Sequence, residues 1–170
     1  MPQKASLLVK EKQAGNERLA VALKGFRSGV LRQQFGDPVD GSTAYRVCIY
    51  DGDDALVADL VVDRAGVACV SKPCWKAVSS KGWKYRDTTA SADGIHGIVA
   101  KSGSGKAKLI IKGRNRSSKG QSSLPSGIAS ALTGSSRASV RVLTSDADCF
   151  AGNLGRVKKD TGSLFKAFGP

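Results

Sequence analysis

Four cysteines carry the most specific chemistry in this sequence. They stand at positions 48, 69, 74 and 149, and an even number favours two disulfides. The segment between Cys69 and Cys74 contains Pro73, which predicts a turn that brings these two thiols within bonding distance. Cys48 would then pair with Cys149 and close a loop of about 100 residues. A zinc site and four reduced thiols are the alternatives, and zinc is disfavoured because close cysteine spacing occurs only once.

Positively charged side chains are a second candidate for function. The 170 residues include 27 Lys and Arg against 14 Asp and Glu, a net charge of +13, so attraction to nucleic acid, acidic glycans or lipid headgroups is expected at low salt. The densest cluster, a candidate polyanion-binding site, contains Lys106, Lys108, Lys112, Arg114, Arg116 and Lys119. Because other cations are spread along the whole chain, a solvated surface is the favoured interpretation of the charge, and a dedicated polyanion site is its competitor.

Three aromatic residues, Trp75, Trp83 and Tyr85, lie close together in the sequence. Alternation places Trp83 and Tyr85 on one face of a strand. If exposed, the three rings would form a platform for stacking sugars or bases, and if buried they would belong to the core. Only 6% of the chain is aromatic, which favours the core because the fold needs large side chains there.

Few residues in the sequence could take part in catalysis. His96 is the only histidine, so sites that need several imidazoles are excluded, and its alternation with Ile95 predicts the polar face of a strand. The string 100–107, AKSGSGKA, approaches a phosphate-binding loop. Ala107, however, stands where that loop needs a hydroxyl, and a strand follows where it needs a helix, so a hairpin is expected. We therefore expect no enzymatic activity, no metal site and no cofactor.

The elements that would position these residues are predicted to be strands. Short apolar-alternating runs recur between turn signals, and no window keeps a helical period for three turns. The expected strands are 6–12, 18–24, 44–50, 55–62, 82–86, 94–100, 106–112 and 138–144, with one or two more in 156–168. Residues 122–133 predict a loop with at most a short helical turn, because Pro125 cannot sit in a central strand.

These elements predict an all-β fold, an antiparallel β-sandwich of about nine to eleven strands held by two disulfides, as a single domain over residues 1–170. Residues 18–25 and 45–48 are similar to 108–113 and 140–143, which suggests two related halves, 6–63 and 94–168. No run approaches the roughly 18 apolar residues of a membrane span. The first residues lack the apolar core of a signal peptide, so a targeting signal is expected outside this chain.

Several segments together carry a resemblance to a family. They are VCIYD (47–51), KPCWK (72–76), KGWKYRD (81–87), DGI (93–95), GKAKLIIKG (105–113) and VKK (157–159). With them the chain resembles an uncharacterised β-rich, cysteine-containing domain of predicted exported proteins from environmental bacteria, deltaproteobacterial or metagenomic, in which it is often appended or repeated. The resemblance covers nearly the whole chain but includes no known active site, so it implies no activity.

The resemblance does imply a setting and a cysteine pattern. The setting is extracellular or periplasmic, with one cysteine pair around Lys72 and Pro73 and another joining Cys48 to the region of Cys149. The chain departs from the family at Phe150, where Trp is commoner, and in the Arg- and Ser-rich insertion 114–120. The basic cluster therefore lies partly outside what the resemblance covers.

The expected function follows from a rigid domain without catalytic groups. Such a domain suits a non-catalytic exported structural or adhesive module that self-assembles into a surface or filament layer, or contacts neighbouring domains of a larger exported protein. The alternative is a basic polyanion-binding protein, either nucleic-acid-coating or capsid-like, or specific for acidic glycans. A steep loss of binding with salt would distinguish the alternative.

Overall fold

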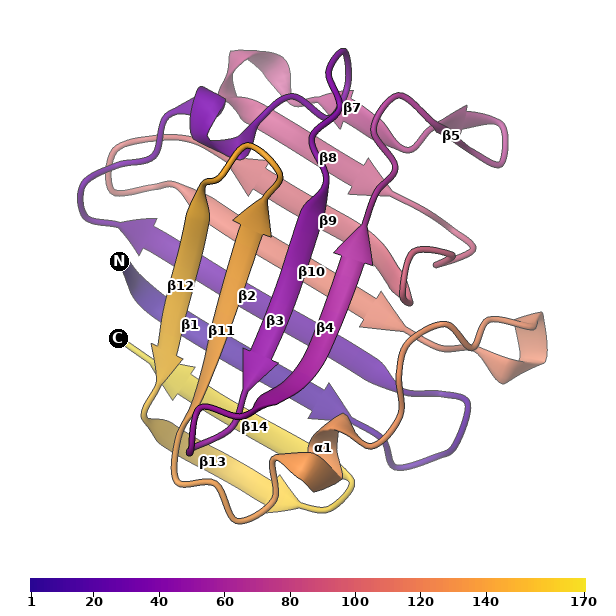
Figure 1. The fold of residues 1–170 in the computed structure, drawn as a ribbon, viewed down its shortest axis with the longest axis vertical. Coiled ribbons are helices and arrows are strands. Elements are labelled where there is room, and N and C mark those ends of the chain that lie inside the picture. The colour runs from indigo at the N-terminus through magenta and orange to yellow at the C-terminus, as the bar shows by residue number, and fades with distance from the viewer.

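Fourteen strands in three antiparallel sheets form the protein in a computed structural model that describes residues 1–170 (Figure 1). The eight-stranded sheet has the order β13-β14-β1-β2-β10-β9-β8-β7. Its strands are β1 (Pro2–Lys10), β2 (Arg18–Phe26), β7 (Trp75–Ala77), β8 (Gly82–Arg86), β9 (Ile95–Lys101), β10 (Lys108–Arg114), β13 (Arg156–Thr161) and β14 (Leu164–Gly169). The all-β, antiparallel prediction is confirmed.

A four-stranded sheet and a small hairpin complete the strands. The four-stranded sheet has the order β12-β11-β3-β4. It consists of β3 (Tyr45–Tyr50), β4 (Leu56–Val62), β11 (Ala138–Thr144) and β12 (Cys149–Leu154), while β5 (Ala68–Cys69) pairs with β6 (Lys72–Pro73). The helices are short: η1 (Arg32–Phe35), η2 (Ser79–Lys81), η3 (Ser117–Lys119) and α1 (Ile128–Ala131). None of them has the length and apolar composition that crossing a membrane requires.

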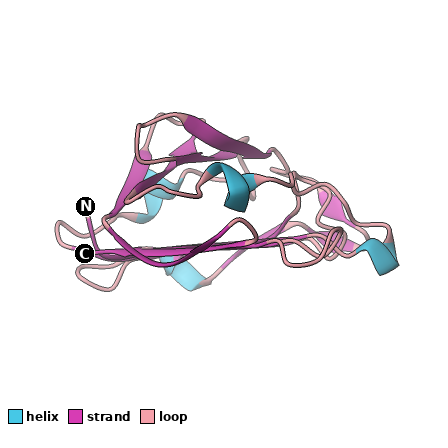
Figure 2. Ribbon diagram, turned by 90° about the horizontal axis from the view of Figure 1, so that it is seen from below, coloured by secondary structure: helices cyan, strands magenta, loops and turns pink.

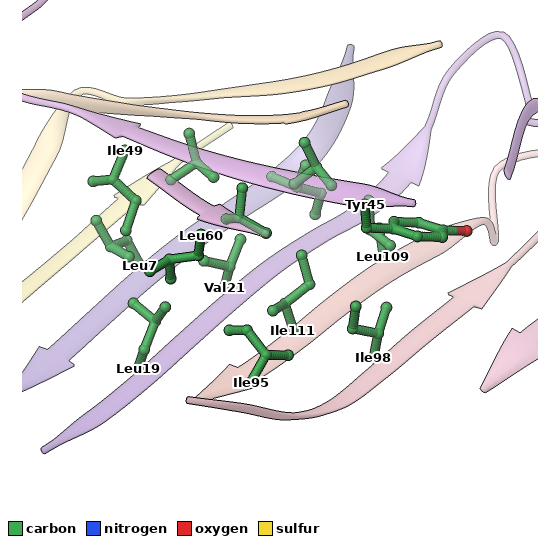
Figure 3. Packing of buried hydrophobic residues seen from close by; sticks show 14 of the residues in the cluster. Leu7, Leu19, Val21, Tyr45, Ile49, Leu60, Ile95, Ile98, Leu109 and Ile111 are labelled. Carbon is green, nitrogen blue, oxygen red and sulfur yellow. The ribbon is translucent and has the colours of Figure 1, made fainter. Parts of the chain in front are cut away.

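The four-stranded sheet lies over one face of the eight-stranded sheet, and its strands run across those behind it (Figures 1 and 2). Alternation along each strand decides which side chains enter the space between the layers. On β2, Leu19, Val21 and Leu23 are buried while Arg18 and Lys24 are exposed. The buried side chains of both sheets form one cluster of 37 residues, part of which Figure 3 shows. The other face of the large sheet, called the outer face below, is turned away from this core.

Fourteen strands exceed the nine to eleven expected. Three of the additional ones, β5, β6 and β7, have only two or three residues, too few for an alternating pattern to register. The fourth, β12, has the sequence CFAGNL, in which the inward position of Gly152 interrupts the apolar period. A Cβ atom on Gly152 would lie 2.5 Å from Leu23 Cδ2, so glycine is required where the two sheets approach closely.

The prediction of two disulfides is half correct. Cys69 and Cys74 are bonded, as their spacing suggested. The predicted bond between Cys48 and Cys149 is wrong, because both residues are free thiols. Cys48 lies on β3 and Cys149 on β12, and β11 runs between these strands. One disulfide therefore ties the β5–β6 hairpin to the start of β7, and the small sheet has none.

The aromatic platform is also wrong, and the core interpretation is correct. Trp75, Trp83 and Tyr85 are each at most 3% exposed. Tyr45 stacks on Trp75 with ring centroids 5.0 Å apart, and Trp75 lies 5.0 Å from Tyr85. Trp83 donates its indole N–H to the carbonyl of Gly36 at 2.7 Å. These rings fill the core and offer no stacking surface.

The strand order repeats itself about the centre of each sheet. The hairpins β1–β2, β3–β4 and β7–β8 occupy the positions that β9–β10, β11–β12 and β13–β14 occupy on the other side. At the centre, β2 pairs with β10 in one sheet and β3 with β11 in the other, both antiparallel. The predicted halves, 6–63 and 94–168, leave out β7 and β8, which stand where β13 and β14 stand across the centre.

Candidate anion-binding face

The outer face of the eight-stranded sheet has an extreme charge composition. Its eight strands contain fifteen Lys and Arg residues and one acidic residue, Asp160. Asp160 pairs with the buried Phe165 and so lies on the inner side of the sheet, where it accepts a hydrogen bond from the backbone of Gly134. No carboxylate therefore projects from a strand onto the outer face.

Four lysines form a row across the outer face. Lys4 on β1 stands opposite Lys24 on β2, Lys24 opposite Lys108 on β10, and Lys108 opposite Lys101 on β9. Cβ atoms of directly opposed residues are about 5 Å apart, and like charges in such pairs destabilise a sheet. We call these four residues the lysine row; across four strands it spans roughly 14 Å.

A second set of cations occupies the other end of the same strands. Lys10, Arg18 and Arg114 stand opposite one another on β1, β2 and β10. Arg18 and Lys24 are six positions apart on β2, which is about 20 Å along the strand. Between the two sets the outer face carries mostly small and aliphatic side chains, among them Ala20, Ala22, Ile110 and Val99, with Lys112 opposite Ala20. The face is therefore cationic at both ends and weakly apolar in the middle.

A pocket of about 530 Å³ lies at the second set of cations. Of its thirteen lining residues, none is acidic. We call it the basic pocket; its charged and titratable lining residues are Arg18, His96, Lys112, Arg114, Arg116 and Lys119. His96 is the extra residue of a β-bulge, since Lys112 pairs with Gly97 while Gly113 pairs with Ile95. Bulges re-aim a side chain, and this one places the imidazole in the pocket lining.

The electrostatic environment of the pocket lowers the pKa of two of its residues. Partial burial, with the charges of Arg114, Lys112 and Arg116 next in importance, lowers the pKa of His96 to about 4. Burial, followed by the charges of Arg116 and Arg18, also lowers the pKa of Arg114. His96 is therefore neutral at pH 7 and can donate or accept a hydrogen bond, and the surrounding cations repel one another.

Two buried polar residues hold the wall of the pocket. Asn115 donates through Nδ2 to Glu17 Oε2 at 2.8 Å and to the carbonyl of Leu124 at 2.7 Å, and its Oδ1 accepts from the Leu124 N–H at 2.8 Å. Glu17 Oε1 accepts from the N–H of Gly15 at 2.8 Å. The Glu17 carboxylate thus faces buried donors rather than the pocket, although the neighbouring Asn16 and Arg18 line it. It fixes the loop that follows β10 without neutralising the basic side chains.

The ion pairs of the protein lie elsewhere. Arg46 pairs with Asp59 on the four-stranded sheet, and Arg137 lies 3.5 Å from Asp54. No Lys or Arg of the outer face is within ion-pairing distance of a carboxylate. The cations of this face are consequently free to bind anions from solution. Their N–H groups are available as hydrogen-bond donors.

The structure divides the predicted polyanion cluster into two groups. Lys112, Arg114, Arg116 and Lys119 line the basic pocket, whereas Lys106 and Lys108 lie at the opposite end of β10, beside Lys4 and Lys24. The predicted polyanion-binding site did not include Arg18, His96, Lys4, Lys24 or Lys101. For the four cations the available signal was alternation, which turns these side chains away from the buried positions of β1, β2 and β9, whereas His96 reaches the pocket through the bulge. The chain matches no family model, no curated protein and no solved structure.

Proposed function

We propose that this protein binds an extended polyanion across the outer face of its eight-stranded sheet. The observation that carries the proposal is the opposition of like charges without any carboxylate among them. A fold selected only for stability would alternate signs across paired strands, because opposite charges in these positions stabilise a sheet and like charges destabilise it. Departures of this kind from local design rules are characteristic of functional sites.

The extent of the charge indicates a polymer rather than a single small ligand. The lysine row spans roughly 14 Å across the strands, and the basic pocket lies about 20 Å from it along them. One small anion cannot contact both, whereas a chain of phosphates or of acidic sugars can. Affinity would come mainly from the release of counterions, so it should fall steeply with salt.

The test compares two variants with the same net charge. The first replaces three residues of the lysine row, Lys24→Gln, Lys101→Gln and Lys108→Gln. The control replaces three exposed cations outside the strands of the outer face, Arg27→Gln, Lys72→Gln and Lys81→Gln. Fluorescence anisotropy with a labelled single-stranded oligonucleotide and with labelled heparin, at several salt concentrations, reports affinity and its salt dependence.

The row variant should bind more weakly and lower the log–log salt slope by about two to three, because each lost phosphate contact removes about one from the slope. The control variant should retain most of the affinity of the parent protein. Equal losses of affinity in both variants would show that net charge alone, and not the lysine row, causes the attraction. Absence of binding to both polymers at low salt would refute the proposed function.

A second candidate function is the structural or adhesive module expected from the sequence. One observation favours it: β4 forms an edge of the four-stranded sheet and exposes Leu56 at 53% and Val61 at 39%. The N–H of Val61 donates to Asp93 at 2.7 Å, but no strand pairs with this edge, and a sheet edge with apolar side chains is a template for adding a strand from another chain. Self-association seen by light scattering, and lost in Val61→Lys, would support this role.

The proposal includes an oxidising setting, extracellular or periplasmic. The Cys69–Cys74 disulfide supports it, since such bonds persist in oxidising compartments and are rare in the cytosol. Mass spectrometry of protein from the native host, alkylated before reduction, would show whether this bond is present in the cell.

A further inference from the structure

The basic pocket differs from the rest of the outer face in being concave. It lies between β2, β10 and the loop that begins at Asn115, and basic side chains reach it from three directions. Arg18 comes from β2, Lys112 from β10, and Arg116 from the loop after that strand. The lysine row is flat, so it can only contact successive charges along a polymer. The converging side chains of the pocket can surround a single anionic group.

Arg114 has donors to spare inside this pocket. A guanidinium carries five N–H donors, yet the structure gives it one hydrogen bond, from Nη2 to the carbonyl of Thr88 at 3.5 Å. Its Nε–H is buried and has no partner. With so few partners, the guanidinium has donors left for an acceptor that enters the pocket it lines.

The number of charges selects among possible anions. Arg18, Lys112, Arg114, Arg116 and Lys119 bring five positive charges to one pocket that no carboxylate lines. A single carboxylate or phosphodiester carries one negative charge and would compensate only one of the five, so an anion with more charge in the same volume fits the pocket better. A phosphate monoester carries about 1.5 to 2 negative charges near neutral pH, and its oxygens match the geometry of arginine donors.

We propose that the basic pocket is a site for a compact, multiply charged phosphate, either a terminal phosphate monoester or a diphosphate. This inference rests on the proposed function, since it assigns the pocket to the end group of a polyanion that continues along the outer face. The neutral His96 suits this role, because its imidazole can donate a hydrogen bond to a phosphate oxygen without adding to the repulsion among the cations.

The test uses inorganic pyrophosphate and inorganic phosphate as probes, with the full chain. Calorimetry gives the affinity, and the proton resonances of the single histidine report whether the anion binds beside it. Two single-stranded oligonucleotides of about 12 nucleotides, identical except for a 5′-phosphate, then test the end group. Heparin of similar length, which has sulfate groups but no terminal phosphate, separates phosphate recognition from general polyanion binding.

Two double variants provide the matched comparison. Arg18→Gln with Arg114→Gln removes an opposed pair of cations at the pocket, and Lys24→Gln with Lys108→Gln removes an opposed pair from the same two strands at their other end. The pocket variant should lose about tenfold or more in pyrophosphate affinity, together with the advantage of the 5′-phosphorylated oligonucleotide. The lysine-row variant should keep both while it weakens binding of the unphosphorylated polymer.

Each contrary result has a distinct meaning. If the polymers bind but pyrophosphate neither binds nor shifts the histidine resonances, the pocket inference fails and the proposed function stands. If both double variants lose pyrophosphate affinity equally, the attraction is diffuse and the inference also fails. If no polymer binds, the proposed function fails independently of the pocket.

Discussion

Lys24 and Lys108 stand directly opposite each other at the centre of the large sheet, where β2 meets β10. The same two strands oppose Arg18 and Arg114 six residues away. No acidic side chain lies between the members of either pair. The central ladder of the protein therefore holds like charges together at both ends, at a cost in stability that binding of an anion would offset.

Reversing one charge of the lysine row should stabilise the protein. Lys108→Glu would convert its contacts with Lys24 and Lys101 from repulsive to attractive and raise the free energy of unfolding by about 1 kcal/mol in low salt. Urea unfolding measures the change, and high salt should remove most of it. Lys72→Glu on β6, which stands opposite Cys69, should leave stability nearly unchanged. A destabilised Lys108→Glu variant would show that the row carries no repulsive strain.

Removal of the Asn115 side chain should destabilise the pocket wall. Asn115→Ala would delete three hydrogen bonds and leave the carboxylate of Glu17, which is 5% exposed, without its side-chain partner. We expect a loss of about 2 to 4 kcal/mol in the free energy of unfolding, because hydrogen bonds to charged groups and unsatisfied buried groups are both costly. Chemical denaturation measures the loss, with the exposed Asn153→Ala as control. An unchanged midpoint would mean that water replaces the amide.

Acidification should destabilise the protein between pH 6.5 and 4. The pKa of His96 is lowered from 6.5 to about 4 by burial and neighbouring cations, so within this window the unfolded chain binds a proton that the folded chain does not. The free energy of unfolding should therefore be level above pH 6.5 with respect to this group and fall as the pH drops toward 4. The lowered pKa values of Glu17 and Asp87 act in the same direction at still lower pH.

The variant His96→Gln isolates this contribution. Denaturation of both proteins from pH 4 to pH 7.5 should give a smaller pH dependence for the variant, and the histidine resonances of the parent protein should titrate with a midpoint near 4. A midpoint near 6.5 would show that the imidazole is solvated and that the pocket cations do not act on it.

The two free cysteines should differ in reactivity. Cys149 is exposed and should react rapidly with a thiol reagent in the folded protein. Cys48 is buried, and its pKa is raised by burial and by the nearby Asp59 carboxylate, so its reaction should follow unfolding. Cys149→Ser should abolish the rapid phase alone. Denatured protein that shows no free thiol would restore the disulfide between these residues.

Local pattern was enough to predict the long strands, because alternation and turn residues are written in neighbouring positions. The short α1 turn was also predicted, and Glu11 caps it by accepting from the N–H groups of Ile128 and Ala129 at 3.1 and 3.0 Å. What escaped prediction depends on contacts between distant segments. The sequence of β12 offers no apolar period at Gly152 because Leu23 of the other sheet fills that space.

In the candidate site, too, local sequence pattern predicted some residues, while others depend on contacts between distant segments. The cations from Lys106 to Lys119 stand out in the sequence because they are adjacent in it, and four of the predicted six line one pocket. The lysine row could not be predicted, since the partnership of Lys24 with Lys108 is a matter of register between strands that are distant in sequence. The role of His96 in the pocket depends on a bulge, which no composition signals in advance.

The position of the two chain ends has a mechanical consequence. β1 and β14 are antiparallel neighbours, with Ala5 opposite Gly169, so both ends leave the sheet side by side (Figure 1). A force that pulls these ends apart loads the hydrogen bonds between β1 and β14 one pair after another, as in the opening of a zipper, rather than all together in shear. Tension along the chain would therefore peel β1 from β14 at low force, whereas a load applied through the outer face would be shared by the whole sheet.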